Sequence, residues 1–452
     1  MLIDSQLLIK LDRPVPRYTS YPTAPQFYPL DEKIFFEKAA LFQKSDRPLS
    51  LYIHIPFCKS MCLFCACSVV LNRNAERQNR YFSHLLQEIS LVQSKIGKRN
   101  IAQLHLGGGT PTNLTEEEFV QLMEHLRKLF IFEEGAELSI EVDPRTVFED
   151  KGKKLRLLRN LKFNRVSFGV QDLDPKVQEG VKRRQTEEMT ETTYYLAKEL
   201  GFSGINIDLI YGLPFQTRVT FRKTAEKLMA LKPDRIAFYS YAKVPWLKPH
   251  QKAIPEAALP TTEEKFQIYL EAREIFIEAG YTAIGMDHFA LFSDSLAKGH
   301  IEKKLTRNFQ GYSLALAEDL IGLGATSVGF LENAYFQNEK EIERYETQVG
   351  NGCIPVVKGF VLKEEDLVRR FVIQSLMCHF ELNKREFQSR FALDFDTHFQ
   401  ALQPSLEQLK KEGLLEETEE KLTPTLIGSW FIRLIASQFD AYLSNGKFSK
   451  AV

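Results

Sequence analysis

The feature that most constrains the fold is an alternation of short apolar segments with longer helical segments between about residues 48 and 245. The apolar segments are mostly rich in β-branched or aromatic residues and end at Gly, Pro or a polar residue, as strands do. They span 49–56, 102–109, 137–144, 165–171, 205–212 and 235–242. Helices are predicted near 75–96, 115–131, 150–161, 187–201 and 218–231. Right-handed crossovers join such units, so the sequence predicts an α/β fold with a parallel (β/α)6 partial barrel.

Chemically active residue types gather at one end of these strands. A cysteine cluster follows the first strand, Gly107–Thr110 follow the second, and Glu141 and Asp143 end the third. Gln171 ends the fourth strand, and Asp208 lies within the fifth. Parallel barrels carry their chemistry at the carboxyl ends of their strands, so we expect an active site at this edge.

The rest of the chain suggests two further parts. We expect residues 1–47 to form an arm that covers the active site, 48–345 to form the barrel with an extension, and 346–452 to form a smaller, mostly helical C-terminal domain. A short hairpin in the last part resembles a winged helix. Residues 360–452 hold 12 Lys and Arg against 14 Asp and Glu, so a lid or substrate-covering role is favoured over DNA binding.

Charge and hydropathy exclude several classes of protein. Lys and Arg number 59, as do Asp and Glu, so the whole chain has no electrostatic footprint for nucleic acid. Asp4 and Lys10 interrupt the first apolar run, which argues against a signal peptide, and no apolar run is long enough for a membrane span. We expect a cytoplasmic protein, and a monomer.

Three cysteines have the spacing C-x3-C-x2-C. Cys58, Cys62 and Cys65 come from one short loop. Zinc is the alternative, but structural zinc sites usually draw four ligands from two separated pairs. A loop with three thiolates suits a [4Fe–4S] cluster better and leaves one iron without a protein thiolate. The amino and carboxylate groups of S-adenosylmethionine (SAM) are suited to chelate that iron.

The remaining cysteines are interpreted differently. Cys67 as a fourth ligand would leave no site for SAM, so we expect it to lie near the cluster and to act in catalysis. The alternative is that Cys67 is a small residue that fills space. Cys353 and Cys378 stand alone in the sequence and are interpreted as buried, inert thiols.

Motifs along nearly the whole chain resemble those of the oxygen-independent coproporphyrinogen III oxidases, a branch of the radical SAM family. In order they are RYTSYPTA, the cysteine loop, HLGGGTPT, SIEVDP, FGVQD, NIDLIYGLP, YSYAKVP, GMDHFAL and RNFQGY. The resemblance implies a barrel of the radical SAM type. It also implies radical oxidative decarboxylation of two propionates of coproporphyrinogen III to vinyls, giving protoporphyrinogen IX in heme biosynthesis. An electron donor and an electron acceptor, which the sequence does not identify, are implied as partners.

The resemblance also implies two bound SAM molecules. Residues implied for the first are Tyr52, Gly108, Glu141 and Val328. Residues implied for the second are Phe64, Gly109, Thr110, Gln171, Arg183, Asp208 and Ala242. The glycines allow close approach of a ligand to the main chain, although a tight turn would also require them. Glu141 and Asp208 could instead be salt-bridged barrel residues.

A substrate with four carboxylates requires cations at the mouth of the site. Arg17, and Arg307 with Gln310 in the RNFQGY segment, are the candidates, while Lys243 and Lys248 are weaker ones. Three histidines near strand ends are expected to be packed and hydrogen-bonded rather than iron ligands: His54, His105 and His288.

Three departures from the family pattern bear on substrate and turnover. They are Leu63, where an aromatic residue is common, Ala66, where glycine is common, and segment 243–254. Two other functions therefore stay open. One is a heme-binding, chaperone-like protein on the same scaffold, and the other is a radical SAM enzyme with another substrate.

Overall fold

A computed structural model describes residues 4–443 and 448–451, and its centre is one large mixed sheet. The sheet has 13 strands in the order β1-β17-β16-β15-β14-β2-β5-β6-β7-β8-β9-β11-β10. Its parallel strands are β2 (Leu49–Ile55), β5 (Asn100–Gly108), β6 (Ile131–Val142), β7 (Arg165–Gln171), β8 (Gly204–Tyr211), β9 (Arg235–Ser240) and β14 (Asp319–Leu323). The six predicted strands and their parallel order are confirmed.

The seventh parallel strand was not predicted. β14 pairs with β2 in parallel register, with Leu323 beside Ile53. Glycines explain why so short a strand fits there, because a Cβ at Gly322 would lie 2.8 Å from the backbone of Val328. Antiparallel strands extend the sheet at both ends: β15 (Val328–Leu331), β16 (Ala334–Asn338), β17 (Val356–Val361) and β1 (Tyr28–Pro29) at one end, and β11 (His288–Leu291) and β10 (Tyr281–Ile284) at the other.

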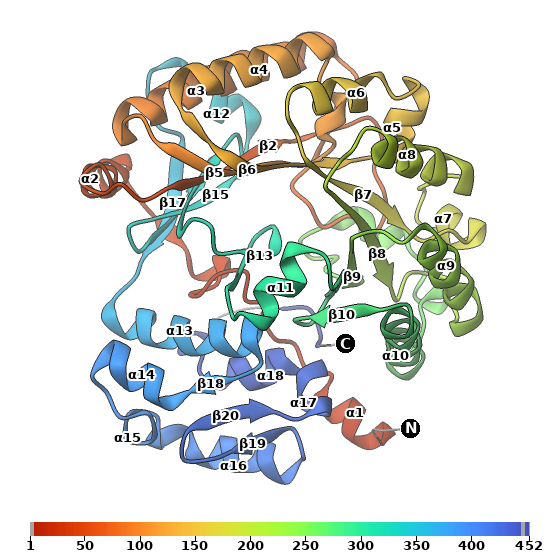
Figure 1. Ribbon diagram of the computed structural model, residues 1–452, viewed down its shortest axis with the longest axis vertical. Helices are drawn as coiled ribbons and strands as arrows, with labels where there is room; N and C mark the ends of the chain where they lie inside the picture. The colour runs from red at the N-terminus through yellow and green to blue at the C-terminus, as the bar shows by residue number, and fades with distance from the viewer. Residues whose placement is uncertain (1–3, 444–447, 452) are drawn as a thin grey trace.

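Helices cover the outside of the parallel part of the sheet (Figure 1). They are α3 (Ala75–Ile96), α4 (Glu116–Leu129), α5 (Pro144–Glu149), α6 (Lys153–Asn160), α7 (Pro175–Gly180), α8 (Glu187–Glu199), α9 (Arg218–Leu231) and α10 (Thr262–Glu278). The Thr115–Glu118 pair at the start of α4 forms a reciprocal capping box, with bonds of 2.8 and 3.1 Å. Burial on both faces explains the nearly continuous apolar run of β2.

The C-terminal residues fold into a helical unit with a small sheet, below the barrel in Figure 1. Its helices are α13 (Glu364–His379), α14 (Lys384–Phe391), α15 (Phe395–His398), α16 (Gln403–Lys411), α17 (Leu426–Trp430) and α18 (Ile432–Ser437). Its strands are β18 (Leu382–Asn383), β19 (Leu415–Glu417) and β20 (Lys421–Pro424). One continuous apolar core joins this unit to the barrel.

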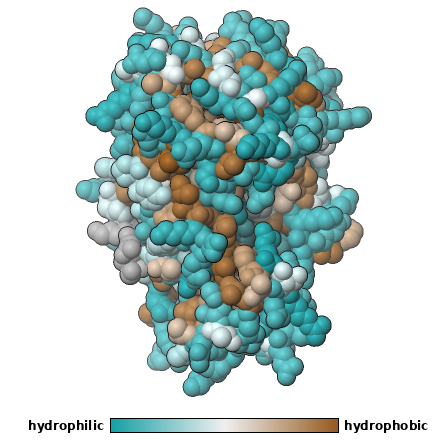
Figure 2. All heavy atoms as spheres, turned by 90° about the vertical axis from the view of Figure 1, so that its left-hand side faces the viewer, coloured by the Kyte–Doolittle hydropathy of each residue, from teal (hydrophilic) through white to brown (hydrophobic). Residues whose placement is uncertain are grey.

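Figure 2 shows a mostly hydrophilic face of the molecule with a broken hydrophobic band running down its middle.

The N-terminal segment contacts both the barrel and the C-terminal unit. α1 (Ser5–Leu11) contacts α10, and α2 (Glu32–Phe42) packs against α3. Arg433 of α18 donates hydrogen bonds to the carbonyls of Val15 and Pro16, and Tyr18 donates to Asp440. The C-terminal unit therefore holds the segment that leads to Arg17.

The extension after the barrel adds a short hairpin and two helices. The hairpin is β12 (Leu305–Asn308) with β13 (Gly311–Leu314), and the helices are α11 (Ser295–Ile301) and α12 (Ile342–Gly350). The side chain of Tyr312 in β13 donates to the carbonyl of Met377 in α13. Within the described residues, no helix is long and apolar enough to cross a membrane.

Candidate active site

The cysteine loop is tied at both ends to the carboxyl edge of the barrel. It runs from β3 (Phe57–Cys58) to β4 (Val70–Leu71), and these short strands pair with each other. The amide of Val70 donates to the carbonyl of Pro56 at 2.8 Å. A backbone bond of 2.9 Å from Leu63 to Val181 holds the middle of the loop against the segment that follows α7. Backbone hydrogen bonds therefore hold the loop at both its ends and its middle.

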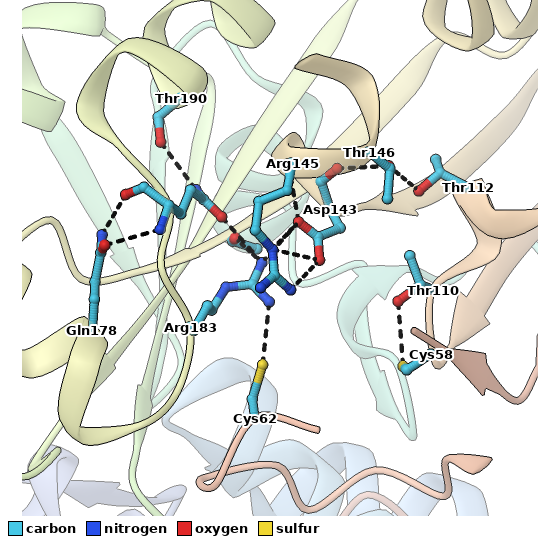
Figure 3. Close-up of polar contacts among 12 residues, drawn as sticks. Cys58, Cys62, Thr110, Thr112, Asp143, Arg145, Thr146, Gln178, Arg183 and Thr190 are labelled. Atoms are coloured by element: carbon cyan, nitrogen blue, oxygen red, sulfur yellow. Dashed lines mark hydrogen bonds and ion pairs between the residues drawn. The ribbon is translucent and has the colours of Figure 1, made fainter. Parts of the chain in front are cut away.

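Each of the three predicted ligands has a different polar neighbour. The Sγ atom of Cys58 lies 3.3 Å from the hydroxyl of Thr110, and Arg183 donates from Nη1 to the Sγ atom of Cys62 at 3.6 Å (Figure 3). Cys65 forms a side-chain hydrogen bond with Cys67. The hydroxyl and the guanidinium are donors suited to thiolate sulfur.

The thiols of Cys65 and Cys67 differ in acidity. The contact with Cys67 lowers the pKa of Cys65 to about 7, and the same contact raises the pKa of Cys67 above its usual value. Cys65 is therefore the more acidic of the two thiols. Burial raises the pKa of Cys58 to about 11, so metal would have to displace its proton.

The donor set fits a cubane better than a single ion. The three thiols come from one short loop, whereas structural zinc sites usually draw four ligands from two separated pairs. A zinc ion requires its ligands to converge on one point at about 2.0–2.3 Å. In an Fe–S cluster each thiolate binds a different iron, so three thiols on one loop need not converge. Cys58, Cys62 and Cys65 thus suit three corners of a [4Fe–4S] cluster.

Segment 243–254 anchors the cysteine loop from outside, which sequence reasoning missed. Lys248 donates to the carbonyl of Cys67 at 2.7 Å, and the ring of His250 lies 2.8 Å from the carbonyl of Cys65. Gln251 donates to the carbonyls of both Phe64 and Ala242 at 3.1 Å. The sequence analysis names Lys248 only as a weaker candidate for the cations at the mouth, whereas the structure places it against the cysteine loop.

Backbone geometry requires glycine beside the loop. Gly108 has φ +113°, and a Cβ there would lie 2.4 Å from the ring of His54. A Cβ at Gly109 would lie 2.7 Å from the backbone of Pro56. This close approach brings the end of β5 against the cysteine loop, where the amides of Gly109 and Thr110 donate to the carbonyls of Ile55 and Phe57 at 2.8 and 3.0 Å.

Glu141 faces an open space inside the barrel. Its side chain is 42% exposed although it lies near the carboxyl end of β6. The amide of Gly108 donates to Glu141 at 3.0 Å, and His105 lies 3.5 Å away. Burial raises the pKa of Glu141, but these two neighbours outweigh it and lower the pKa overall. Tyr52 stacks on His105 with ring centroids 5.9 Å apart, so it borders the same space.

A second polar group lies on β7 and β8. Asp208 accepts hydrogen bonds from Ser167 at 3.0 Å and from Asn206 at 2.7 Å. Burial, with the charge of Glu141, raises the pKa of Asp208 to about 7. Gln171 has φ +71°, and its buried Oε1 has no hydrogen-bond partner in the described part of the chain. Polar atoms left in this way are suited to a ligand rather than to packing.

A carboxylate between two arginines borders Cys62. Asp143 accepts from Arg145 at 2.6 Å and lies 3.5 Å from Arg183 (Figure 3). Arg145 also lies close enough to Cys62 for that thiol to raise its pKa. Burial lowers the pKa of Arg145, but the bond and charge of Asp143, with those of Cys62, raise it overall. Sequence reasoning overlooked Arg145, although it directly follows the third strand end and Pro144.

The other predicted residues lie at the edges of the site. Val328 begins β15, next to β14 and the carboxyl end of β2. Both ring nitrogens of His54 have partners, Tyr52 and Ser68, and His288 pairs with Asp287 at 2.7 Å. These two histidines are packed and hydrogen-bonded as expected.

The predicted cations meet beyond the ends of β8 and β9. Arg17 donates from Nη2 to the carbonyl of Ser240 at 2.8 Å and lines a pocket with Tyr211 and Arg433. Arg307 is committed to Asp287, with contacts of 3.0 and 3.2 Å, and donates to the carbonyl of Arg17. Arg307 therefore positions the backbone of Arg17.

Gln310 and the two lysines take different positions. Gln310 lies at the turn of the β12–β13 hairpin, and both polar atoms of its side chain are buried without a partner among the described residues. Lys243 pairs with the exposed Glu256 at 2.7 Å. Of the three, only Gln310 presents unsatisfied polar atoms, and Lys248 is the anchor of the cysteine loop.

The family models, the curated relatives and a solved structure that match this chain all point to the same family. The radical SAM superfamily model matches residues 52–228, and the model of the HemN C-terminal domain matches 362–431. The chain is 40% identical to the oxygen-independent coproporphyrinogen III oxidase of Synechocystis, over 99% of this chain and 98% of that one. It is also 40% identical to the Escherichia coli protein of the same name, over 97% and 95%. A solved structure of that E. coli coproporphyrinogen III oxidase, described as a radical SAM enzyme, matches 98% of this chain and 100% of its own with a TM-score of 0.91.

Proposed function

The chain belongs to the oxygen-independent coproporphyrinogen III oxidases, which are radical SAM enzymes, and from this premise we propose how its residues carry out the reaction. The family's activity is oxidative decarboxylation of two propionates of coproporphyrinogen III to vinyls. The observation that supports it most directly is the thiol loop of Cys58, Cys62 and Cys65 at the carboxyl edge of a parallel barrel. A [4Fe–4S] cluster and SAM are its cofactors.

The three thiols hold the cluster, and other groups hold SAM. When bound and reduced by one electron, the cofactors supply a carbon radical strong enough to take a hydrogen atom from a propionate C–H bond that no side-chain base could deprotonate. Glu141, whose pKa is lowered, would accept hydrogen bonds from the first SAM beside Gly108. Tyr52 and Val328 would border the same molecule.

A second SAM would lie against the polar group on β7 and β8. The residues proposed to line it are Phe64, Gly109, Thr110, Gln171, Arg183, Asp208 and Ala242. The unpartnered Oε1 of Gln171 supports this assignment, because it needs a donor from a ligand. With a pKa near 7, Asp208 can hold or accept a proton at its carboxyl group. Cys67, whose thiol lies beside that of Cys65, is proposed to act near the cluster and not as a ligand.

The substrate carboxylates are proposed to meet Arg17, with Arg307 positioning it and Gln310 contributing its unpartnered amide. We propose that residues 1–47 and 346–452 cover this mouth, since Arg433 ties the two together. Closure around the substrate would exclude water from the radical. We also propose that the protein is a monomer and that it is cytoplasmic. Size-exclusion chromatography with light scattering would test the oligomeric state.

The reaction itself is tested anaerobically with the reconstituted enzyme. It is incubated with SAM, dithionite and coproporphyrinogen III, and porphyrins are separated after oxidation. We expect a divinyl product, with methionine formed in proportion. Stoichiometric capture of heme without product would indicate the chaperone-like function instead. Cleavage of SAM without decarboxylation would indicate another substrate.

A further inference from the structure

Positive charge is concentrated in three segments of a chain that has no net charge. Segments 57–73, 144–154 and 174–184 together hold ten Lys and Arg but only four Asp and Glu. The cysteine-loop segment, 57–73, contains no acidic residue. All other segments together hold 49 basic and 55 acidic residues. The excess of six positive charges is therefore a local property.

The cysteine-loop segment is in direct contact with both of the other segments. Lys59, directly after Cys58, lies 3.8 Å from Glu149 at the end of α5. The middle of the cysteine loop is bonded to Val181 in the third segment. Arg73 donates to the carbonyl of Lys59 at 3.2 Å, which brings the far end of the cysteine loop to the same place. The three segments thus form one surface over the predicted cluster, which we call the cationic face.

Most of these cations are free to meet a partner. Two arginines of the segments, Arg145 and Arg183, are turned inward to Cys62. Seven of the others are exposed: Lys59, Arg73, Lys151, Lys153, Lys176, Lys182 and Arg184. The ion pair of Lys59 with Glu149 and that of Arg184 with Glu179 join exposed side chains, with Lys59 64% and Arg184 82% exposed. Exposed pairs contribute little to stability and exchange readily.

We propose that the cationic face is the docking site of a small acidic protein that carries one electron. This inference rests on the proposed function, which requires an electron to enter the cluster for every SAM that is cleaved. Lys59 and Ser60 are exposed and lie between two cluster ligands, so a carrier on this face is separated from the cluster only by the loop itself. The carrier is a low-potential flavin or Fe–S protein, which is oxidised by one electron as the cluster is reduced by one.

The face also has the properties of a short-lived electron-transfer contact. Leu71, at the end of the cysteine loop, is 52% exposed, and Met61 is half-buried beside the cations. A small surface with few apolar side chains among charged ones suits weak, fast-exchanging complexes. Complementary charge chiefly raises the association rate, and salt screens it. A nucleic acid would use the charge but has no electron to give.

The test uses a bacterial flavodoxin in its hydroquinone form as the probe. Reduction of the reconstituted holoenzyme is followed by stopped-flow bleaching of the cluster at several salt concentrations. The variant carries Arg73→Glu, Lys182→Glu and Arg184→Glu. A matched control reverses two exposed lysines outside the three segments, Lys304→Glu and Lys340→Glu. Binding of oxidised flavodoxin, measured by flavin fluorescence anisotropy, gives a second readout that does not depend on turnover.

We expect the variant to lose at least tenfold in the second-order rate constant and in affinity at low salt, and to lose most of its salt dependence. Reduction by photoexcited deazariboflavin, which is neutral, should be the same for all three proteins. Equal flavodoxin rates for variant and wild type, or an equal loss in the control, would overturn the proposal. So would tight binding of a short RNA that the variant loses while its flavodoxin rate is unchanged. If deazariboflavin-reduced enzyme failed to decarboxylate the porphyrinogen, the proposed function would fall but the docking result would stand.

Discussion

Arg183 donates a hydrogen bond to the Sγ atom of Cys62 while its other terminal nitrogen lies 3.5 Å from Asp143. Asp143 also accepts two bonds from Arg145 at 3.0 and 2.6 Å, and Arg145 contacts Cys62 in turn. One carboxylate thus sits between two guanidiniums, and the group carries a net positive charge next to one predicted ligand. Hydrogen bonds to ligand sulfurs and nearby charge are among the factors that set the potential of an Fe–S cluster.

We therefore predict that Arg145→Leu lowers the reduction potential of the cluster. Removing a cation disfavours the extra electron, and we expect a shift of about 60 mV, a tenfold change in a one-electron equilibrium. An EPR-monitored redox titration without SAM measures this directly. Arg145→Lys, which keeps the charge, should shift less. Equal potentials for wild type and Arg145→Leu would show that the cation does not act on the cluster.

A methyl group at Gly108 should block SAM binding. Its Cβ would meet the ring of His54 at 2.4 Å, and its φ of +113° is unfavourable for alanine. We expect Gly108→Ala to weaken SAM binding at least tenfold, measured by equilibrium dialysis with the reconstituted protein. Gly135→Ala is the matched control, since Gly135 also has positive φ (+81°) but has no described atom within 4 Å of the added Cβ. A similar loss of affinity in both variants would point to general damage instead.

Local patterns in the sequence were enough to predict the six parallel strands and the loop of three thiols. Each depends on residues close together in the chain. The anchoring of Cys65 by His250 joins residues 185 positions apart, so no local pattern reveals it. The pairing of Arg307 with Asp287 and the joining of β14 to β2 likewise depend on how distant segments pack.

The buried carboxyl group of Glu88 in α3 should make the stability of the protein depend on pH. It accepts hydrogen bonds from Tyr345, Asn338 and the amide of Gly324. Burial raises its pKa from 4.5 to about 7 despite these donors. Between these pH values the native state binds a proton that the unfolded state has released, so the free energy of unfolding falls as pH rises, by about 3 kcal/mol in total.

The variant Glu88→Gln removes this titration. It also loses acceptor bonds, so we expect it to be less stable than the wild type throughout. The difference in melting temperature between the two proteins should narrow as pH rises from 4.5 to 7. Thermal scans at several pH values, with the cluster intact, measure this difference. A constant or widening difference would show that Glu88 is already ionised in the native protein across this range.

Arg17 should act on substrate binding and not on SAM. Losing a charge-assisted hydrogen bond costs about 1.5–3 kcal/mol, so Arg17→Gln should lower kcat/KM for coproporphyrinogen III roughly 10- to 100-fold, mainly through KM. Cleavage of SAM in the absence of porphyrinogen should be unchanged. Arg13→Gln, an exposed arginine of the same segment, is the control. A loss of SAM cleavage in Arg17→Gln would place Arg17 in cofactor binding instead.

The central claim is that Cys58, Cys62 and Cys65 bind three irons and leave the fourth open to SAM. Mössbauer spectroscopy of protein reconstituted anaerobically with 57Fe, recorded with and without SAM, tests it most directly. The account predicts four irons per cluster, one of which changes its isomer shift when SAM is added, both in the wild type and in Cys67→Ala. Four irons that all ignore SAM, or a Cys67→Ala protein that loses its cluster as Cys62→Ala does, would contradict it.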